Sequence, residues 1–171
     1  AALGFCSMEQ NFKKIFPFVL NPKEAYEYHY MGPGLFKRAP LSAIIRRDVF
    51  ESYGGFKPIR MAGDFEMWQR LAQKCSIVLM PQGMVWYRCH DAQEVNDFSA
   101  FEQVYEDLKV AYLNSKDFPL GKEVAERIKS REKANNRRWM IRGLLKLDFK
   151  TAKIFYKNLR TYRIPSAFDI D

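Results

Sequence analysis

The sequence lacks the features that are typical of extracellular or membrane-spanning proteins. Its three cysteines, Cys6, Cys75 and Cys89, form no Cys-x-x-Cys pair. An odd number of unpaired cysteines disfavours a disulfide framework and favours a reducing, cytoplasmic setting. No apolar run approaches the roughly 20 residues that a membrane helix needs, since the stretch IFPFVL is short and contains Pro17. The start of the chain does not match a signal peptide, and we expect it to be part of a longer protein.

The composition is that of a globular protein, and its charge is unevenly distributed along the chain. Hydrophobic residues make up 47% of the 171 residues and aromatics 15%, which excludes a disordered chain. Residues 1–120 hold 14 Lys/Arg and 14 Asp/Glu, whereas residues 121–171 hold 14 Lys/Arg and 6 Asp/Glu. The whole net charge of +8 therefore lies in the last part of the chain. This distribution predicts either an anionic partner for that end or a solvated basic helix face.

The first half of the chain alternates helix and strand signals. Asn21, Pro22 and Glu24 have the arrangement of a capping box at a helix start. APLSAIIRRDVF predicts a short strand from Leu41 to Arg46 that runs into a helical turn, and the glycines of SYGGF end that turn. From Asp64 the apolar spacing becomes helical, with a stripe of Phe65, Trp68, Leu71, Ala72 and Cys75. SIVLMP and GMVWYRC then predict two strands.

The second half predicts helices only. One apolar stripe is formed by Phe101, Val104, Tyr105, Leu108 and Tyr112, and a long polar helix follows from about Pro119 to Gly143. Asp148 is placed to cap a last helix that carries both an apolar and a basic stripe. The predicted fold is α+β, mostly helical with a few short strands. Its predicted parts are residues 1–95, an α/β portion, and residues 96–171, a basic C-terminal helical region.

Three segments carry a resemblance to a known family: SAIIRRDVFESYGGF, GDFEMWQRL and VWYRCH, in this order. Together they resemble the family 2 glycosyltransferases of the GT-A fold, which usually show a serine-containing strand ending in Arg, a GGF turn, an acidic pair before a Trp helix, and a YR-x-H strand. The resemblance covers roughly residues 35–93. It implies the C-terminal, acceptor-side portion of an inverting glycosyltransferase, which transfers a sugar from a nucleotide-sugar donor to a saccharide or lipid-linked acceptor.

The sequence departs from the family pattern in two places. The acidic pair appears as Gly63-Asp64, so only the second acid is present. The Asp-x-Asp motif that holds Mg²⁺ or Mn²⁺ against the diphosphate is missing, because the one such triplet, Asp169 to Asp171, follows the helices and is best explained as chance. The resemblance therefore implies that the metal is bound mainly by a separate N-terminal nucleotide-sugar-binding half. No metal is expected in this chain, and the chain alone is expected to be inactive.

The resemblance assigns Asp64 the role of catalytic base, which takes the proton from the attacking hydroxyl. Its alternative role is a plain helix N-cap. His90 is the candidate ligand for the metal or the diphosphate, and its alternative is a hydrogen-bonded loop histidine. Arg88 is a candidate for binding phosphate oxygens, or else forms a surface salt bridge.

Two further residues are candidate substrate contacts. Arg46 and Arg47 end the predicted strand, and alternation would direct only one of them inward, so Arg47 is retained as a substrate-binding candidate. Trp68 is a candidate for stacking on a sugar, although packing in the core is the more common role of such a residue. Cys89 beside His90 does not predict a nucleophilic pair, because neighbouring strand residues point in opposite directions.

A different function class remains open for the C-terminal helices. Lys150, Lys153, Lys157 and Arg160 form a basic stripe beside an apolar one. Such helices can lie on an anionic membrane surface, for instance at the inner face of a membrane. Nucleic acid is the less expected partner, because the sequence contains no nucleic-acid-binding motif. The ordinary alternative is that the apolar stripe, Ala152, Phe155, Tyr156, Leu159 and Tyr162, packs on the core of the protein itself.

Overall fold

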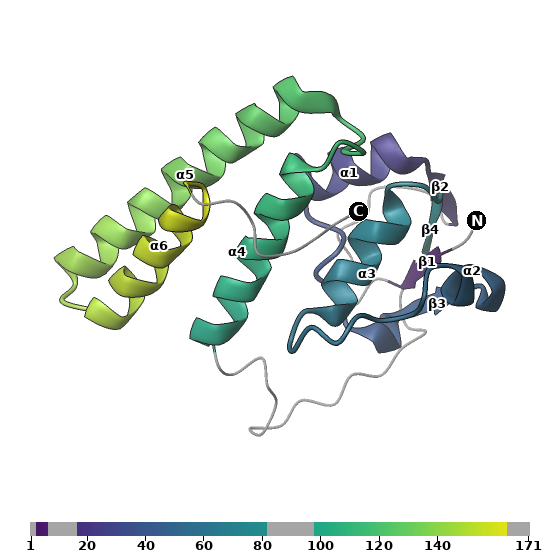
Figure 1. Ribbon diagram of the computed structural model, residues 1–171, viewed down its shortest axis with the longest axis horizontal. Helices are drawn as coiled ribbons and strands as arrows, with labels where there is room; N and C mark the ends of the chain where they lie inside the picture. Colours follow the sequence, from purple (N-terminus) through teal and green to yellow (C-terminus); the bar gives the residue numbers. More distant parts are fainter. Residues whose placement is uncertain (1–2, 7–16, 82–97, 164–171) are drawn as a thin grey trace. The chain divides into compact units, whose positions relative to one another are not determined.

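The computed structural model describes residues 3–6, 17–81 and 98–163, and its architecture is mostly helical α+β (Figure 1). The chain divides into two compact units, residues 1–93 and residues 94–171. In its described part, the first unit contains short strands and three α-helices, whereas the second contains helices alone. The two units are treated separately below.

The described strands of the first unit form one sheet with the order β2–β4–β1–β3. The strands are β1 (Leu3–Cys6), β2 (Phe18–Leu20), β3 (Ala43–Ile45) and β4 (Ile77–Met80). The central pair, β1 and β4, is parallel, and the two outer pairs are antiparallel. Both edge strands have only three residues, which limits the unpaired backbone that the sheet presents.

The two faces of this sheet differ in burial. Ile77 and Leu79 of β4 are buried, whereas Val78 between them is half-buried, as expected for side chains that alternate along a strand. The register places Val19, Val78, Gly4 and Ile44 in one cross-strand row. Val19 and Ile44 at the ends of that row are 59% and 60% exposed. One face of the sheet therefore carries apolar side chains open to solvent.

The capping box predicted for the first helix is confirmed. Helix α1 (Pro22–Tyr30) begins with the Asn21 carboxamide oxygen accepting the Glu24 backbone N–H at 3.0 Å. The Glu24 carboxylate accepts the Asn21 backbone N–H at 2.9 Å. These two bonds satisfy donors that a helix start otherwise leaves unpaired.

The strand predicted from Leu41 to Arg46 is shorter than expected. A 3₁₀ turn occupies Pro40–Ser42, and the Ser42 hydroxyl donates to the Ala39 carbonyl at 2.7 Å, so the strand begins only at Ala43. Helix α2 (Arg47–Ser52) then follows. Gly54 and Gly55, with φ angles of +72° and +67°, confirm the predicted left-handed stop after this helix.

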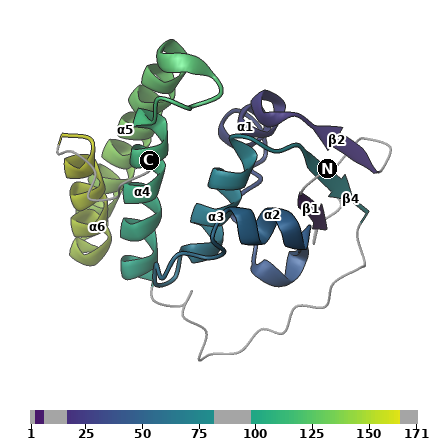
Figure 2. The same ribbon diagram turned by 45° about the vertical axis from the view of Figure 1, so that its right-hand side comes forward.

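Helix α3 (Gly63–Ala72) forms the core of the first unit and lies beside α1, on the same side of the sheet (Figure 2). The predicted stripe of Phe65, Trp68, Leu71 and Ala72 is fully buried, whereas Cys75 lies beyond the helix end and is a free thiol. The two helices are joined by the hydroxyl groups of two α1 tyrosines. Tyr26 donates to the Gln69 carbonyl at 3.0 Å and Tyr30 donates to the Gln69 side-chain oxygen at 2.6 Å.

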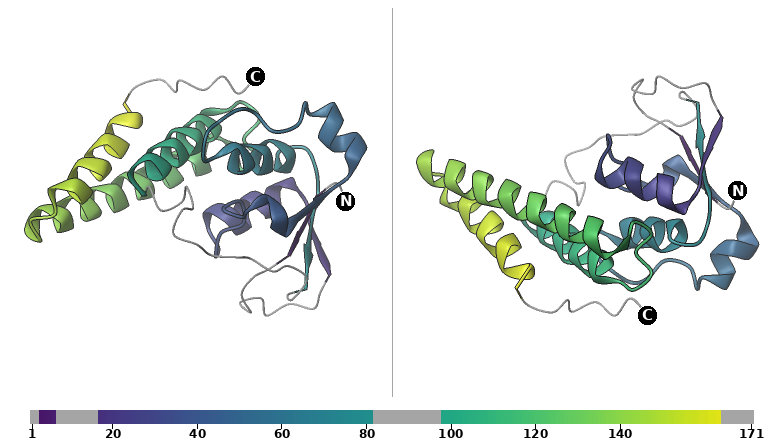
Figure 3. Two further views of the ribbon diagram at one scale, coloured as in Figure 1. Left: turned by 90° about the horizontal axis from the view of Figure 1, so that it is seen from below. Right: turned by 90° about the horizontal axis from the view of Figure 1, so that it is seen from above.

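The second unit is built from α4 (Phe98–Asn114), α5 (Gly121–Leu145) and α6 (Phe149–Thr161), and α5 and α6 form an antiparallel hairpin (Figure 3). The predicted cap of the last helix is confirmed, because the Asp148 carboxylate accepts the Thr151 backbone N–H at 3.0 Å. The predicted apolar stripe of α6 lies partly in the core: Ala152 and Phe155 are buried, but Tyr156 is exposed.

A buried polar network joins the three helices of the second unit. The Glu106 carboxylate of α4 accepts bonds from the Asn136 amide at 2.9 Å, from Lys109 at 2.6 Å and from the Tyr162 hydroxyl. The Asn158 amide of α6 donates to the Asn136 side-chain oxygen at 3.3 Å. Because these groups have left water, their bonds favour the one arrangement of the helices in which all partners meet.

Several predicted features lie outside the described residues. They are the strand predicted over GMVWYRC, the candidates Arg88 and His90, Cys89, and the triplet from Asp169 to Asp171. Within residues 3–6, 17–81 and 98–163, none of the helices combines the length and the apolar character needed to cross a membrane.

Candidate functional site

The loop before α3 is held tightly against the start of that helix. A β-carbon at Gly63 would lie 3.0 Å from the Lys57 carbonyl oxygen, so this position leaves little room for a side chain. Met61 has a φ of +66°, in the left-handed region that residues other than glycine rarely adopt. Such strain persists only where the surrounding structure enforces it, and it is common near functional sites. The close contact also gives a physical reason for a glycine at this position.

The acid next to the candidate base on this helix has a structural role. The Glu66 carboxylate is only 2% exposed and accepts bonds from Arg70 at 2.9 and 3.1 Å, with Lys57 at 3.3 Å. Arg70 also donates to the backbone carbonyls of Tyr53 and Gly55, the latter at 2.7 Å. Glu66 and Arg70 therefore fix the GGF turn against α3. The sequence contains a signal for this pair, since the two residues stand four apart on one helix, but their burial could not be read from that spacing.

Asp64 lies in the first turn of α3, in a different environment from Glu66. The residue is half-buried, and its Oδ1 accepts the Phe65 backbone N–H at 2.7 Å. Ala62 occupies the N-cap position of α3, so Asp64 is not the N-cap residue, although its carboxylate accepts a backbone N–H of the first turn. No cation pairs with Asp64 in the part of the chain that the structure describes. Burial raises the pKa of this carboxyl above its ordinary value, and the bond from Phe65 opposes the rise only in part.

The two carboxylates of α3 are therefore suited to different tasks. Glu66 is neutralised by cations and enclosed, so it cannot accept a proton from a substrate. Asp64 has no cation partner among the described residues, and its raised pKa makes it a stronger base than an exposed aspartate. A carboxylate of this kind can take a proton from a hydroxyl group that approaches the start of α3.

Trp68 lies in the core. Its side chain is fully buried, and the indole Nε1 donates to the Arg38 carbonyl at 2.8 Å. Phe56 contacts the ring edge-to-face, with 5.9 Å between ring centroids. This packing leaves no ring face for a sugar, so the common core role describes Trp68 in this structure and we do not retain it as a substrate contact.

The two arginines after β3 face solvent and pair with acids of their own helix. Arg47, whose side chain is 90% exposed, pairs with Glu51 at 2.8 Å. Arg46 forms two bonds to Asp48, at 3.1 and 2.5 Å. The predicted alternation does not apply to them, because the strand ends at Ile45 and both belong to the start of α2. Neither arginine contacts Asp64 through any described interaction.

The remaining candidates cannot be placed beside Asp64. Arg88 and His90 lie outside the described residues. Among the residues that are described, no group of three or more His, Cys, Asp or Glu side chains could hold a metal ion.

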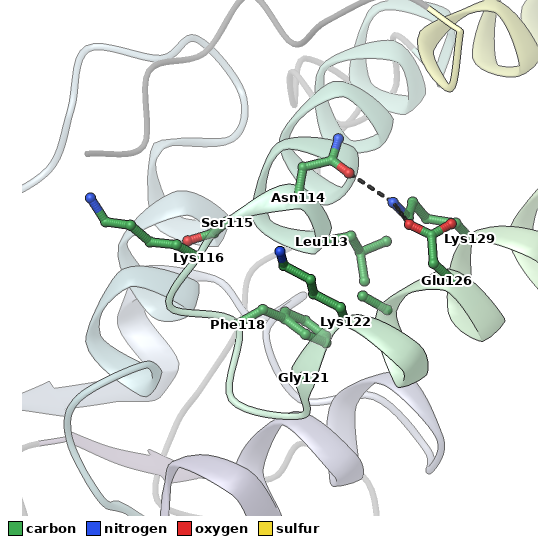
Figure 4. Close-up of a pocket in the computed structure, with 10 residues that line it drawn as sticks. Leu113, Asn114, Ser115, Lys116, Phe118, Gly121, Lys122, Glu126 and Lys129 are labelled. Carbon is green, nitrogen blue, oxygen red and sulfur yellow. Dashed lines mark hydrogen bonds and ion pairs between the residues drawn. The ribbon is translucent and has the colours of Figure 1, made fainter.

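The second unit contains a small pocket of about 190 Å³ at the turn between α4 and α5 (Figure 4). Lys116, Lys122 and Lys129 contribute to its lining. Lys129 donates to the Asn114 side-chain oxygen at 2.8 Å and pairs with Glu126. The charge of Lys129 is therefore compensated inside the protein.

A larger groove of about 510 Å³ lies along the α5–α6 hairpin. Met140, Ile141, Tyr156 and Leu159 supply its apolar part. Its charged residues are all cations: Lys133, Arg137, Arg160 and Arg163. Within the described residues no carboxylate pairs with Arg137, Arg160 or Arg163. The groove therefore combines apolar surface with uncompensated positive charge.

No protein-family model, curated protein or solved structure matches the chain. The candidate site therefore depends on the geometry of its own residues and on the motifs in the sequence.

Proposed function

We propose that the chain is the acceptor-side, C-terminal portion of an inverting glycosyltransferase of the family 2, GT-A type. It transfers a sugar from a nucleotide-sugar donor to a saccharide or lipid-linked acceptor. Asp64 is the general base that deprotonates the acceptor hydroxyl as this oxygen attacks the sugar carbon. Mg²⁺ or Mn²⁺ is bound mainly by a nucleotide-sugar-binding half that is not among these residues.

The observation that carries the proposal is the state of Asp64. The residue stands at the acidic position of the motif series, half-buried and without a cation partner among the described residues. Glu66, two residues later, is by contrast held by Arg70 and Lys57. A base needs the opposite, because a strong ion pair lowers its pKa and weakens it.

The exposed apolar row on the sheet is consistent with a further protein segment that packs against this face. Val19 and Ile44 expose branched apolar side chains at the two ends of one cross-strand row. Covering such a row removes apolar surface from water and is favourable at roughly 25 cal/mol per Å². The proposed donor-binding half is a suitable cover for this face.

The test uses the gene product that carries both halves. Sugar transfer from a panel of nucleotide sugars is measured for the wild type and for Asp64→Asn, together with nucleotide binding by calorimetry. The amide keeps the shape and an oxygen that accepts the Phe65 N–H, but it cannot take a proton. Turnover should fall by at least about 100-fold, the usual contribution of a general base, while nucleotide affinity stays within about twofold.

Asp48→Asn is the matched control, since Asp48 is an acid in the first turn of α2 that is paired with Arg46. This variant should retain wild-type turnover. Equal turnover in Asp64→Asn and the wild type would refute the assigned base.

A further inference from the structure

The turn of the α5–α6 hairpin exposes apolar side chains that no described residue covers. We call Leu144, Leu145, Leu147 and Phe149 the hairpin tip. Leu145, Leu147 and Phe149 are 80%, 75% and 65% exposed. Seven of the twelve exposed large hydrophobic residues in the described part of the chain lie between residues 139 and 156. Their concentration on one hairpin separates this surface from the scattered apolar residues of an ordinary protein surface.

The backbone of the turn is firmly built, so these side chains are held outward. The Asp148 N–H bonds the Gly143 carbonyl at 2.9 Å and the Leu147 N–H bonds the Leu144 carbonyl at 3.1 Å, the two bonds of a Schellman motif. A β-carbon at Gly143 would lie 2.8 Å from the Ala152 nitrogen, which shows how closely the two helices approach here. The space between the helices is therefore already filled by backbone, and the tip leucines cannot fold into it.

Leu147 is an unfavourable choice for the fold in two respects. Its φ of +56° belongs to the left-handed region, where a helix end usually has glycine or asparagine. Its side chain also gains almost no burial in return. A leucine at this position fits a role outside the folded chain.

The charges around the tip point to an anionic surface. Between residues 137 and 157 the chain carries seven Lys or Arg residues and one acid, Asp148. The Asp148 carboxylate already caps α6 through the Thr151 N–H. Arg142, Lys146 and Lys150 stand at the turn itself. The groove described above continues the positive surface along the same hairpin.

We propose that the hairpin tip inserts into the headgroup region of an anionic membrane. Two exposed aromatic residues stand where the headgroup region would lie if the tip were inserted. Trp139 precedes Leu145 by six residues and Tyr156 follows Phe149 by seven, so each stands roughly 9–10 Å from the tip along its helix. An interfacial element inserts by about 5–10 Å, which places both aromatics at the headgroup level where Trp and Tyr are enriched.

A membrane fits this surface better than nucleic acid or a protein groove. The turn between α5 and α6 projects beyond α4 in the views of Figures 1 and 3, and its exposed apolar residues alternate along the chain with Lys146 and Lys150. A bilayer accepts such a shape without a preformed pocket. A nucleic-acid surface would leave the three leucines and the phenylalanine against phosphates. The inference does not rest on the proposed function.

The test is co-sedimentation of the full chain with vesicles of phosphatidylcholine containing 30% phosphatidylglycerol, compared with vesicles of phosphatidylcholine alone. The wild type should bind the anionic vesicles and bind the neutral ones much more weakly. Leu145→Ser combined with Leu147→Asn should lower the partition coefficient about tenfold or more, since these side chains lose their transfer out of water. Asparagine suits the positive φ at position 147, so this variant keeps the turn.

Three further variants separate insertion from adsorption by charge. Lys146→Glu with Lys150→Glu should weaken binding by at least about 25-fold, because each basic residue near an anionic surface contributes about fivefold. Met31→Ser removes an apolar side chain that is 52% exposed in the other unit and should change nothing. Leu145→Trp should give a blue-shifted emission with anionic vesicles and quenching by brominated lipid.

Three results would overturn the proposal. The first is a wild-type chain that stays in the supernatant with anionic vesicles. The second is equal binding by the wild type and the double leucine variant, which would leave adsorption by charge alone. The third is a dimer in sedimentation velocity that the double leucine variant abolishes, which would identify a second copy as the occupant. Circular dichroism of each variant checks that it remains folded.

Discussion

The clearest quantitative prediction concerns Arg70, which holds the GGF turn against α3. Arg70→Met keeps the length of the side chain but removes the guanidinium. Of the two cations described above, the buried Glu66 carboxylate then keeps Lys57, whose side chain is 40% exposed and 3.3 Å away. The carbonyls of Tyr53 and Gly55 also lose their charged donor. The substitution thus leaves a carboxylate and two carbonyl groups short of partners.

The expected cost follows from burial. Removing one partner of a buried ion pair costs about 3–5 kcal/mol, because the remaining charge is left without compensation. Lys57 still offsets part of that charge, so we expect the free energy of unfolding to fall by about 3 kcal/mol. The pair Arg47–Glu51 has the same four-residue spacing and a distance of 2.8 Å, but its side chains are 90% and 61% exposed. Arg47→Met should therefore cost less than about 0.5 kcal/mol.

Urea unfolding followed by circular dichroism measures the two variants, and hydrogen exchange of residues 63–72 locates the effect. A loss of about 3 kcal/mol corresponds to roughly 100-fold faster exchange of the α3 amides that exchange through unfolding. Glu66→Gln combined with Arg70→Met should recover about 1–2 kcal/mol, because no charge is then buried alone. Similar costs for Arg70→Met and Arg47→Met, or a double variant that is less stable than Arg70→Met, would refute the reasoning.

Three further predictions concern stability. Asp64→Asn should stabilise the fold at neutral pH and have no such effect near pH 3. The pKa of Asp64 is higher in the folded state than in the unfolded state, so ionisation of this carboxyl lowers the stability of the fold as the pH rises through these two pKa values. Urea titrations at several pH values measure the effect. Gly143→Ala should lower the melting temperature by several degrees, since its methyl group would meet the Ala152 backbone, and an unchanged value would contradict the close helix contact. Asn136→Ala should lower the free energy of unfolding, measured by calorimetry, by about 2–3 kcal/mol, because the buried Glu106 carboxylate loses a hydrogen-bond donor. A decrease below about 0.5 kcal/mol would show that the network contributes little to stability.

Local signals allowed several helix ends to be predicted. Asn21 and Asp148 cap their helices as the sequence indicates, because a side-chain oxygen and the next turn of backbone are neighbours in the chain. Gly54 and Gly55 adopt the left-handed conformation that such a stop requires. The strand from Leu41 was predicted too long, because the turn that delays it depends on a bond back to Ala39.

The candidate site was predictable only in part. The motif series directed attention to Asp64, whose half-buried carboxyl has a raised pKa, and its role as a base stays a prediction. The same series did not distinguish Arg47, which is exposed and paired, from an arginine that faces a substrate. It also did not show that Trp68 is fully enclosed or that Glu66 and Arg70 form a buried pair. Burial depends on which segments meet in space, and no local spacing contains that information.

The sequence by itself determined several helix ends, the mostly helical composition and the concentration of positive charge after residue 120, since each depends on neighbours along the chain. Only the tertiary structure decided which apolar residues are covered. On α6 it buries Ile154 and Asn158 and exposes Tyr156, and at the end of α5 it exposes Leu145 and Leu147. The physical reason is that a helix presents several similar stripes, and the close approach of another helix selects which one leaves water.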